Sequence, residues 1–414
     1  MNEREAVLNA LIKQEQNGYS TIILNNVLNN INTQNGKNSN SVSFITTLFY
    51  GVIERKITLD YIIEKFLNKL LKKLPVLVLN VLRMAVFEGL YLNTPHFAVV
   101  NEAVNLVKKS KYKYLSGMVN AVVKKAVLYD LKYLNNKPES IKFSCNEDIF
   151  NTVKDYIGKE EAEHFFINSF NKAPVFVSVN TLKTTKEELL KTSDIFLDTD
   201  VENVLELKSF NSKEKLFLNG YYFVQDISAA MCVHLANPKK NERIFDVCAA
   251  PGGKSFLTSL ICKNKAEILS ADIYVKRTEL IKKTAEKLGL NIKTLVNNGE
   301  IYNKDLGKFD LVLCDVPCSG LGTVRRKPEI KYKTLNEIEG LYKIQRNILK
   351  VSSEYVKEGG RILYSTCTLN KKENNEVIEE FLSENKNFYL KEQKVFYNKI
   401  NGGDGFFAAL IYKK

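Results

Sequence analysis

Two cysteines and one carboxylate stand at positions where they could carry out covalent chemistry. Asp315 and Cys318 belong to the run DVPCS, which begins at the end of a predicted strand over 309–315, and Cys367 follows a predicted strand over 361–366. A cysteine thiolate is a strong nucleophile, and a nearby carboxyl group can hold or move a proton. A single cysteine is more often a buried core residue. Two thiols at the ends of neighbouring strands favour a catalytic role over a core-packing role.

The stretch 243–255, RIFDVCAAPGGKS, predicts a ligand loop beside these thiols. A β-forming run is followed by small residues and then by a helical pattern. Gly252 and Gly253 would let the backbone approach a ligand, and a helix N-terminus favours negative charge. An ordinary strand-to-helix turn is the simpler interpretation. A phosphate loop is excluded because Cys248 stands where that motif needs glycine, and no GxGxxG motif indicates a dinucleotide site.

Strand and helix patterns alternate regularly from residue 243 onward. This alternation predicts a Rossmann-like, doubly wound and mainly parallel α/β sheet, with ligands at the carboxyl ends of its strands. Asp272 ends the second strand, where a carboxylate can accept hydrogen bonds from ribose hydroxyls, although it could also cap a helix. We expect a late antiparallel strand over 405–412. The other predicted strands are 243–247, 267–272, 292–297, 309–315 and 361–366, and the predicted helices are 255–262, 275–288 and 335–357.

The loop at 243–255 resembles the cofactor loop of the RNA cytosine-C5 methyltransferases of the NOP2/NSUN type, and DVPCS at 315–319 and YSTCT at 364–368 resemble later motifs of that family. The resemblance implies S-adenosyl-L-methionine as cofactor. Asn298 stands where this family usually has aspartate, and its amide could still contact the adenine. The residues that the resemblance assigns to cofactor binding are Cys248, Ala249, Ala250, Pro251, Gly252, Gly253, Lys254, Asp272, Asn298 and Asp315.

The resemblance also implies catalytic roles for the thiols and the carboxylate. Cytosine C5 is a poor nucleophile, but a thiolate that adds to C6 makes C5 react like an enamine. Cys367 resembles the attacking nucleophile, and Asp315 resembles the carboxyl group that holds the cytosine at N3. Cys318 resembles the second thiol, which assists release of the product. Val316 stands where alanine is usual, and we expect this difference to affect packing only.

Two further runs are expected near the RNA. The basic run RRKPEIK at 325–331 is predicted to hold the RNA backbone beside an unstacked base, although a bare charge run could be a solvated loop. The run GGDGFF at 402–407 matches the family's terminal motif and is expected to shape the wall near the substrate. Ser178 departs from the family, which often has arginine there.

Residues 1–130 are predicted to form an all-α domain. The pattern over 77–91 is apolar almost all round, which predicts the central buried helix. Lysines 108, 109, 111 and 113 alternate with two tyrosines and would suit RNA, but a solvated helix end explains them equally well. The runs that resemble a NusB-type RNA-binding domain, as found ahead of the methyltransferase in bacterial 16S rRNA enzymes of the RsmB/Sun type, are LFYG at 48–51, TLD at 58–60, PHFAVVNEA at 95–103 and VNAV at 119–122.

Residues 131–240 are predicted to form a connector and a small α+β region, ahead of a catalytic domain over 241–414. The connector carries a polar helical pattern over 147–170, and the small region carries a strand over 175–179 and a helix over 186–191. Asn219-Gly220 is a hairpin signal, so a strand pair is expected over 217–224.

Composition limits the function classes that remain. The net charge of +13 and the pI of about 9.1 indicate an anionic partner. Seven irregularly spaced cysteines do not indicate a disulfide framework, and three scattered histidines argue against a metal site. The chain lacks an N-terminal signal core and any apolar run of the ~18 residues that a membrane span needs. We therefore expect a cytoplasmic protein, and nothing demands more than a monomer.

These observations predict a cytosine-C5 methyltransferase that acts on 16S rRNA. An enzyme that modifies tRNA or 23S rRNA is the first alternative, and the NusB-like domain argues against it. The second alternative is a non-catalytic RNA-binding or antitermination protein, which the presence of both thiols and the cofactor loop disfavours. DNA cytosine methylation is disfavoured because a second cysteine, Cys367, follows the proline–cysteine motif on the next strand.

Overall fold

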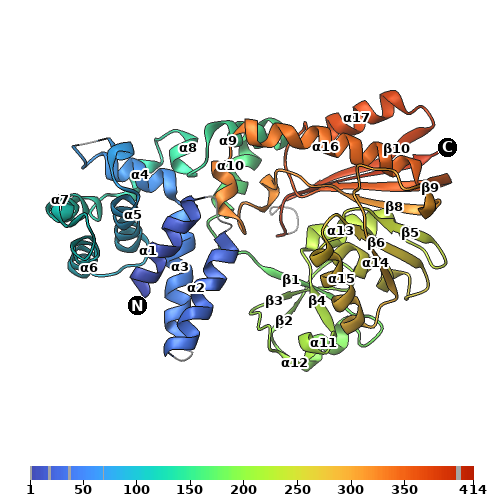
Figure 1. Cartoon of the computed structure of the whole chain (residues 1–414), viewed down its shortest axis with the longest axis horizontal. Coiled ribbons are helices and arrows are strands. Elements are labelled where there is room, and N and C mark those ends of the chain that lie inside the picture. The colour runs from blue at the N-terminus through green and yellow to red at the C-terminus, as the bar shows by residue number, and fades with distance from the viewer. Residues whose placement is uncertain (1, 17–19, 36–38, 69, 398–401) are drawn as a thin grey trace. The chain divides into compact units, whose positions relative to one another are not determined.

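The computed structural model describes residues 2–16, 20–35, 39–68, 70–397 and 402–414. The chain forms two compact units. The helical unit contains Met1–Phe150 and Lys327–Lys333, and the sheet unit contains Asn151–Arg326 and Thr334–Lys414 (Figure 1). The helical unit is therefore built from two separate stretches of chain, and the second stretch begins nine residues after Cys318.

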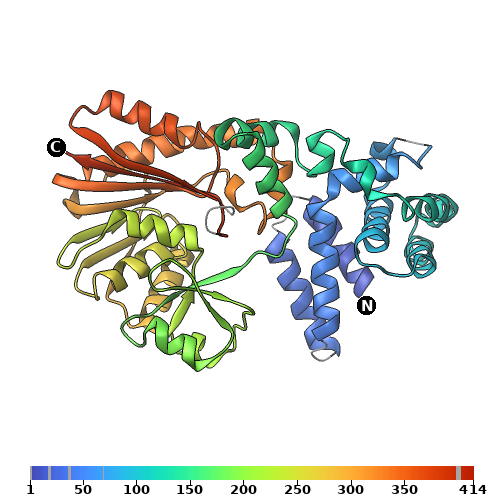
Figure 2. The same ribbon diagram turned by 180° about the vertical axis from the view of Figure 1, so that it is seen from behind.

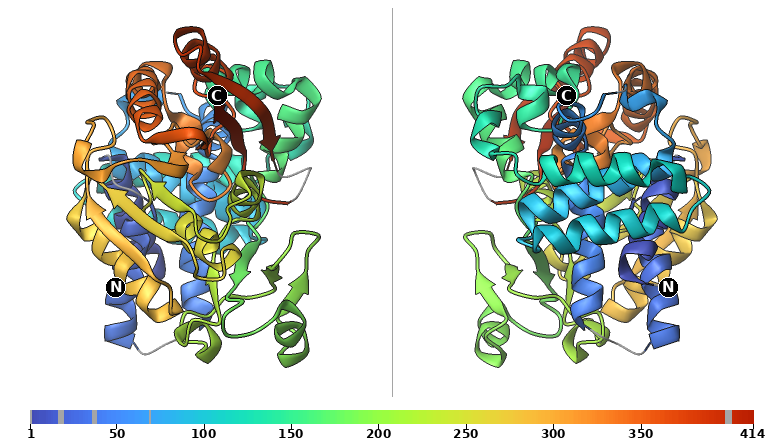
Figure 3. Two further views of the ribbon diagram at one scale, coloured as in Figure 1. Left: turned by 90° about the vertical axis from the view of Figure 1, so that its right-hand side faces the viewer. Right: turned by 90° about the vertical axis from the view of Figure 1, so that its left-hand side faces the viewer.

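All regular secondary structure among the described residues of the helical unit is helical, as the sequence predicted. The helices are α1 (Glu3–Glu15), α2 (Ser20–Asn35), α3 (Ser39–Glu54), α4 (Lys56–Glu64), α5 (Val76–Tyr91), α6 (His96–Lys108), α7 (Ser116–Ala126) and α8 (Glu139–Lys142), with α9 (Glu147–Ile157) running on into the sheet unit. Helices α6 and α7, in cyan and teal in the right-hand view of Figure 3, lie side by side.

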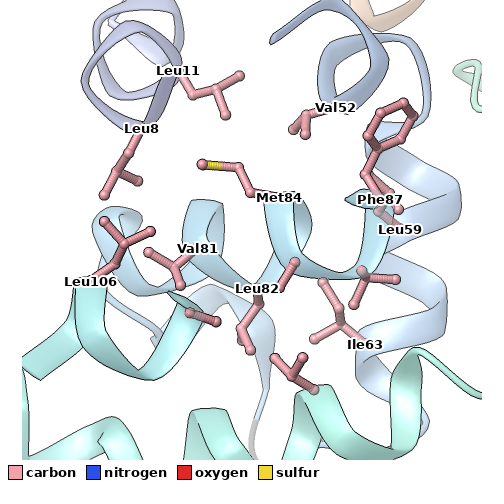
Figure 4. Close-up of a cluster of buried hydrophobic side chains, with 14 of the residues drawn as sticks. Leu8, Leu11, Val52, Leu59, Ile63, Val81, Leu82, Met84, Phe87 and Leu106 are labelled. Carbon is pink, nitrogen blue, oxygen red and sulfur yellow. The ribbon is translucent and has the colours of Figure 1, made fainter. Parts of the chain in front are cut away.

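Helix α5 is the central buried helix, which confirms the prediction from its apolar pattern. Its residues Val81, Leu82 and Met84 are at most 2% exposed. Figure 4 shows that they point toward side chains of the surrounding helices. The helices α3 and α5 approach closely at Gly51, where a Cβ atom would lie 1.9 Å from the Phe87 ring, so only glycine fits.

The segment Lys327–Lys333 is part of the core of the helical unit. It forms a short 3-10 helix, Pro328–Tyr332, whose Lys331 and Tyr332 side chains are enclosed by the first stretch. The Tyr332 hydroxyl donates to the carbonyl of Ile53 and bonds to Ser144. The Asn146 amide donates to the carbonyls of Tyr332 and Lys333.

The sheet unit contains a seven-stranded sheet of order β10-β11-β9-β8-β5-β6-β7. Five neighbouring strands, β9 to β7 in that order, are parallel, and β11 and β10 continue the sheet in antiparallel fashion. All five predicted parallel strands and the late antiparallel strand are confirmed, whereas β10 was not predicted. The strands are β5 (Arg243–Asp246), β6 (Glu267–Asp272), β7 (Ile292–Val296), β8 (Phe309–Asp315), β9 (Val356–Thr366), β10 (Phe388–Phe396) and β11 (Phe406–Lys413).

Helices cover both faces of this sheet, so the fold is doubly wound and Rossmann-like, as predicted (Figure 1). Side chains alternate along each strand: Ile244 packs on the face of α13 (Ile227–Ala236), whereas Phe245 packs on the face of α16 (Leu335–Glu354) and α17 (Asn375–Glu384). Helices α14 (Gly253–Ile261) and α15 (Val275–Leu288) lie on the α13 side.

A second, antiparallel sheet of order β2-β3-β1-β4 precedes the parallel one, in green in Figure 2. The strand pair expected over 217–224 is wrong. The Glu214 carboxylate accepts hydrogen bonds from the backbone N–H groups of Leu216 and Phe217 and starts a helical turn, so only β4 follows as a strand. The elements here are α10 (Lys159–Asn168), β1 (Val175–Val179), α11 (Lys186–Thr192), β2 (Phe196–Asp198), β3 (Val204–Leu207), α12 (Lys215–Leu218) and β4 (Tyr222–Val224).

Candidate active site

The glycine loop joins β5 to α14 as predicted. Gly252 has φ +108°, in the left-handed region, and a Cβ atom there would lie 2.3 Å from the Phe256 ring. Helix α14 begins at the next residue, Gly253, so its N-terminal N–H groups belong to this loop. At the end of β7, a Cβ on Gly299 would lie 2.8 Å from Val247 Cγ1. At both positions the neighbouring side chains leave no room for a Cβ atom, so glycine is required.

Acidic residues end two adjacent strands beside this loop. Asp246 at the end of β5 is 0% exposed, and its Oδ2 accepts a hydrogen bond of 2.6 Å from Ser255 while its Oδ1 has no partner among the described residues. Burial raises the pKa of Asp246 to about 7. Asp272 ends β6 and accepts a hydrogen bond from the Tyr274 N–H group. Asn298 follows β7, and its side-chain oxygen accepts from the Glu300 N–H group.

The two predicted thiols lie in contact. Strands β8 and β9 are parallel neighbours in which Asp315 pairs with Ser365, so the turns that follow them meet at one edge of the sheet. The Sγ atoms of Cys318 and Cys367 are 3.2 Å apart. This hydrogen bond to Cys367, burial and nearby negative charges raise the pKa of the Cys318 thiol well above its ordinary value. Cys318 therefore stays protonated.

Asp315 lies in a network with Lys254 and Ser365. Its Oδ2 is 2.7 Å from Lys254 Nζ, and its Oδ1 accepts a hydrogen bond of 2.7 Å from the Ser365 hydroxyl. Burial opposes the charge of Lys254, but the attraction of Asp315 and other acidic groups outweighs it and raises the pKa of Lys254 to about 12. Lys254 is thus a fixed positive charge held against the Asp315 carboxylate.

A pocket of about 350 Å³ opens beside this ion pair within the sheet unit. Arg326 lies in its wall and donates to the carboxylates of Asp404 at 2.6 Å and Asp226 at 3.0 Å. Burial raises the pKa of Asp404 to about 6. The pocket is lined by Val175, Phe176, Val224, Gln225, Asp226, Ala229, Ala249, Ala250, Pro251, Gly253, Lys254, Asp315, Arg326, Asp404 and Phe406.

The basic run at 325–331 is divided between the two units, and the prediction that its cations hold the RNA backbone is wrong for Lys331. Lys331 is 0% exposed, and its Nζ donates to the carbonyl oxygens of Glu54 and Phe143 inside the helical unit. It is closed to RNA. Arg325 donates to the Gly402 carbonyl, and Arg326 is paired with two aspartates.

Sequence reasoning missed one buried carboxylate at the thiol turns. Glu373 is 0% exposed and accepts hydrogen bonds from Ser319, which follows Cys318. In the sequence it lies in the polar run KKENNE, which is typical of a solvated surface. The structural role of Asp226 could be read from the sequence more easily. This residue directly precedes a helical pattern, and it is the N-cap of α13.

All seven cysteines are free. Across the residues described above, the structure holds no group of three or more His, Cys, Asp or Glu side chains that could bind a metal ion. A search of the same residues finds no helix with the length and apolar character needed to cross a membrane.

Two family models match the chain. The model described as 16S rRNA methyltransferase RsmB/F matches residues 233–411, and the NusB family model matches residues 1–127. A Bacillus subtilis (strain 168) protein named probable ribosomal RNA small subunit methyltransferase B is 32% identical, over 99% of this chain and 98% of that protein. A Proteus mirabilis (strain HI4320) protein named ribosomal RNA small subunit methyltransferase B is 30% identical, over 90% of each chain.

Solved structures share the fold. The crystal structure of PH0851 superposes with a TM-score of 0.81 at 24% identity, covering 99% of this chain and 98% of that one. The structure of NSun6 from Pyrococcus horikoshii with SFG superposes with a TM-score of 0.60 at 21% identity, covering 64% of this chain and 98% of that one.

Proposed function

Because the chain belongs to the family of ribosomal RNA small subunit methyltransferases B, we propose that it methylates carbon 5 of one cytosine in 16S rRNA through a covalent cysteine adduct. Its family is S-adenosylmethionine-dependent and acts on RNA of the small ribosomal subunit. The choice of cytosine C5 and the covalent mechanism are the proposal, and the contact between the thiols of Cys318 and Cys367 carries it.

The residues at the ends of β5, β6 and β7 fit S-adenosylmethionine. The α14 N-terminus and the Asp272 carboxylate offer polar partners, and the positive φ of Gly252 lets the loop turn directly into that helix. The remaining residues assigned to the cofactor, from Cys248 to Lys254 and Asn298, lie in the same loops. When bound, the cofactor supplies an electrophilic methyl group.

Cys367 serves as the nucleophile and Cys318 as its partner. The Cys367 thiolate forms a bond from Sγ to C6 of the cytosine, and the electron pair of the C5–C6 double bond moves toward C5 and the ring. A protonated Cys318 donates its S–H to the Cys367 sulfur and stabilises the thiolate. After C5 has been methylated, a base takes the C5 proton and the electron pair of that C–H bond forms the C5–C6 double bond again. The electron pair of the S–C6 bond returns to the Cys367 sulfur, which the Cys318 S–H group stabilises as it leaves.

Asp315 positions the base. Its carboxylate is fixed by Lys254 on one oxygen and by Ser365 on the other, so it presents a defined acceptor to the N4 amino group of the cytosine, and it contacts N3 through a proton that lies between the two atoms. We place this base at the rim of the pocket that Asp315 and Lys254 line, because Cys318 and Cys367 lie outside the pocket's lining and the base must reach both. A base must leave its stack to enter such a pocket, which single-stranded RNA allows at low cost.

Bisulfite sequencing of total RNA from cells with and without the gene tests the reaction and the substrate together. We expect the loss of one 5-methylcytosine signal in 16S rRNA. A signal lost from tRNA or 23S rRNA would keep the chemistry and change the substrate. If no cytosine signal changed, the proposed reaction would be wrong, and an RNA-binding role without catalysis would replace it.

Variants of the two thiols test the mechanism. Cys367→Ala should abolish methylation, and Cys318→Ala should accumulate a protein–RNA adduct that survives SDS. The buried Cys262 provides a control, because it lies at the end of α14, away from the thiol turns in sequence and in hydrogen bonding. Cys262→Ala should keep methylation and form no adduct. Normal turnover by Cys367→Ala would exclude the covalent scheme.

A further inference from the structure

The carboxylate of Glu373 connects the two turns that carry the thiols. Its Oε2 accepts a hydrogen bond of 2.8 Å from the backbone N–H group of Ser319, and its Oε1 accepts from the Ser319 hydroxyl. The hydroxyl of Thr368, which follows Cys367, is 2.7 Å from the Ser319 hydroxyl and 3.3 Å from Glu373 Oε1. One carboxylate thus contacts the residue after each cysteine.

Two amide side chains complete the cluster around this carboxylate. Gln345 of α16 donates at 2.9 Å both to Glu373 Oε2 and to the carbonyl of Pro317, which precedes Cys318. Asn370 donates to Glu373 Oε1 at 3.0 Å. Glu373, Ser319, Thr368, Gln345 and Asn370 are all at most 2% exposed. The cluster therefore holds the Cys318 turn from both sides of the cysteine.

A buried carboxylate bound by neutral donors is costly for a fold. Removing a carboxylate from water costs several kcal/mol, and hydrogen bonds recover that cost only if their geometry is good. All the donors named above are neutral backbone, hydroxyl or amide groups. A neutral glutamine of the same shape would avoid the cost of the charge but would place an N–H group against the donors of Ser319. Residue 373 must therefore offer a hydrogen-bond acceptor at both ends of its carboxylate.

We propose that Glu373 is a positioning residue, which holds the turns of Cys318 and Cys367 together so that the two sulfurs stay in contact. This role rests on the proposed function only where it concerns methylation, because the geometry of the thiols can be measured without RNA or cofactor.

Oxidation by diamide measures the thiol contact directly in the full-length protein. Diamide takes two electrons and two protons from the thiols as the disulfide forms, and mass spectrometry identifies the linked cysteines. We expect a Cys318–Cys367 disulfide in the wild type and an at least fivefold slower reaction in Glu373→Gln. Glu242→Gln makes the same chemical change at the residue before β5, in the pair with Arg361, and should oxidise at the wild-type rate.

Activity separates positioning from loss of fold. Glu373→Gln should lower kcat about tenfold or more and leave the KM for RNA near wild type. If Glu373→Gln does not fold, Ser319→Ala removes one of the same hydrogen bonds and should slow oxidation in the same direction.

Two results would overturn the role of Glu373. The first is oxidation of Cys318 and Cys367 at the wild-type rate in Glu373→Gln and in Ser319→Ala. The second is an equal slowing in Glu373→Gln and Glu242→Gln, which would show a general loss of stability. A wild-type protein that forms the disulfide but methylates no cytosine would contradict the proposed function and leave the positioning role intact.

Discussion

Among the described residues, each of the two units buries one lysine, and the two lysines are held in opposite ways. Lys254 in the sheet unit is paired with the Asp315 carboxylate at 2.7 Å, and its pKa is raised to about 12. Lys331 in the helical unit donates to two backbone carbonyls, and burial lowers its pKa to about 8. A buried ammonium keeps its proton firmly only where a carboxylate compensates the lost hydration.

The difference indicates what each lysine is for. The pair Lys254–Asp315 lies in the wall of a pocket, where a fixed charge can orient a polar ligand. Lys331 lies in the core of the helical unit, where its Nζ donates to two carbonyls at the ends of elements far apart in sequence. The Glu54 side chain faces it, but burial raises the pKa of that carboxyl to about 7, so it is a weak counter-charge. We therefore expect Lys254 to contribute to catalysis and Lys331 to contribute to the stability of the fold.

Lys254→Met should produce the largest effect. It leaves the Asp315 carboxylate without its cation. Breaking a fully buried ion pair costs about 3–5 kcal/mol, and because the Asp315 side chain is 33% exposed we expect about 3 kcal/mol. Expressed in the transition state, that cost lowers kcat/KM about 10²-fold. Single-turnover methylation of RNA measures the effect. A Lys254→Met enzyme within tenfold of wild type would show that this pair is structural and would remove the contrast between the lysines.

Lys331→Met should change the free energy of unfolding and leave the rate of methylation nearly unchanged. It removes the donor to the carbonyls of Glu54 and Phe143, and leaving a buried acceptor unsatisfied costs about 1–3 kcal/mol. We expect a lower free energy of unfolding in urea and a kcat within about twofold of wild type for the folded protein. Thr58→Val provides a matched control, since the buried Thr58 hydroxyl donates to the carbonyl of Ile141 in the same unit. A much larger loss of activity in Lys331→Met than in Thr58→Val would place Lys331 in the machinery of the active site.

The loop and strands of the site could be predicted because their signals are local. The glycines of 252–253 and the alternating strands of the parallel sheet follow from backbone conformation and from side-chain period, which short stretches of sequence determine. The contact between Cys318 and Cys367 then follows from strand order, because neighbouring parallel strands end at the same edge.

Burial of charged residues could not be predicted in the same way. Lys331 and Glu373 lie in runs rich in charge, RRKPEIK and KKENNE, and such runs are usually solvated. Their partners are distant in sequence: the carbonyl of Glu54 for Lys331, and Ser319 for Glu373. The hairpin predicted at Asn219-Gly220 failed for a related reason, since the Glu214 carboxylate bonds to the N–H groups of Leu216 and Phe217 and favours a helical turn there.

The pH dependence of stability gives the smallest and sharpest test of the contrast between the two lysines. Lys331 has a folded pKa of about 8 against 10.5 for a free lysine, so the unfolded chain binds more protons between these values. Its contribution to the free energy of unfolding therefore rises with pH between 8 and 10.5, by at most about 1.4 kcal/mol per pH unit. Glu54 acts below this window, between pH 4.5 and about 7. Cys145, whose pKa is raised from 9.0 to about 12, lowers stability as the pH rises above 9, and it does so in the wild type and in Lys331→Met alike, so the difference between the two proteins reports Lys331.

Lys254 behaves in the opposite way, because its folded pKa of about 12 lies above 10.5. Its stabilisation is complete below pH 10.5 and is lost only as the pH rises through 12. Urea unfolding at pH 8, 9 and 10 should thus show that Lys331→Met flattens the rise in stability and that Lys254→Met preserves it. If Lys331→Met kept the wild-type slope, Lys331 would be as firmly protonated as Lys254. Its carbonyl partners would then hold the charge as well as a carboxylate does.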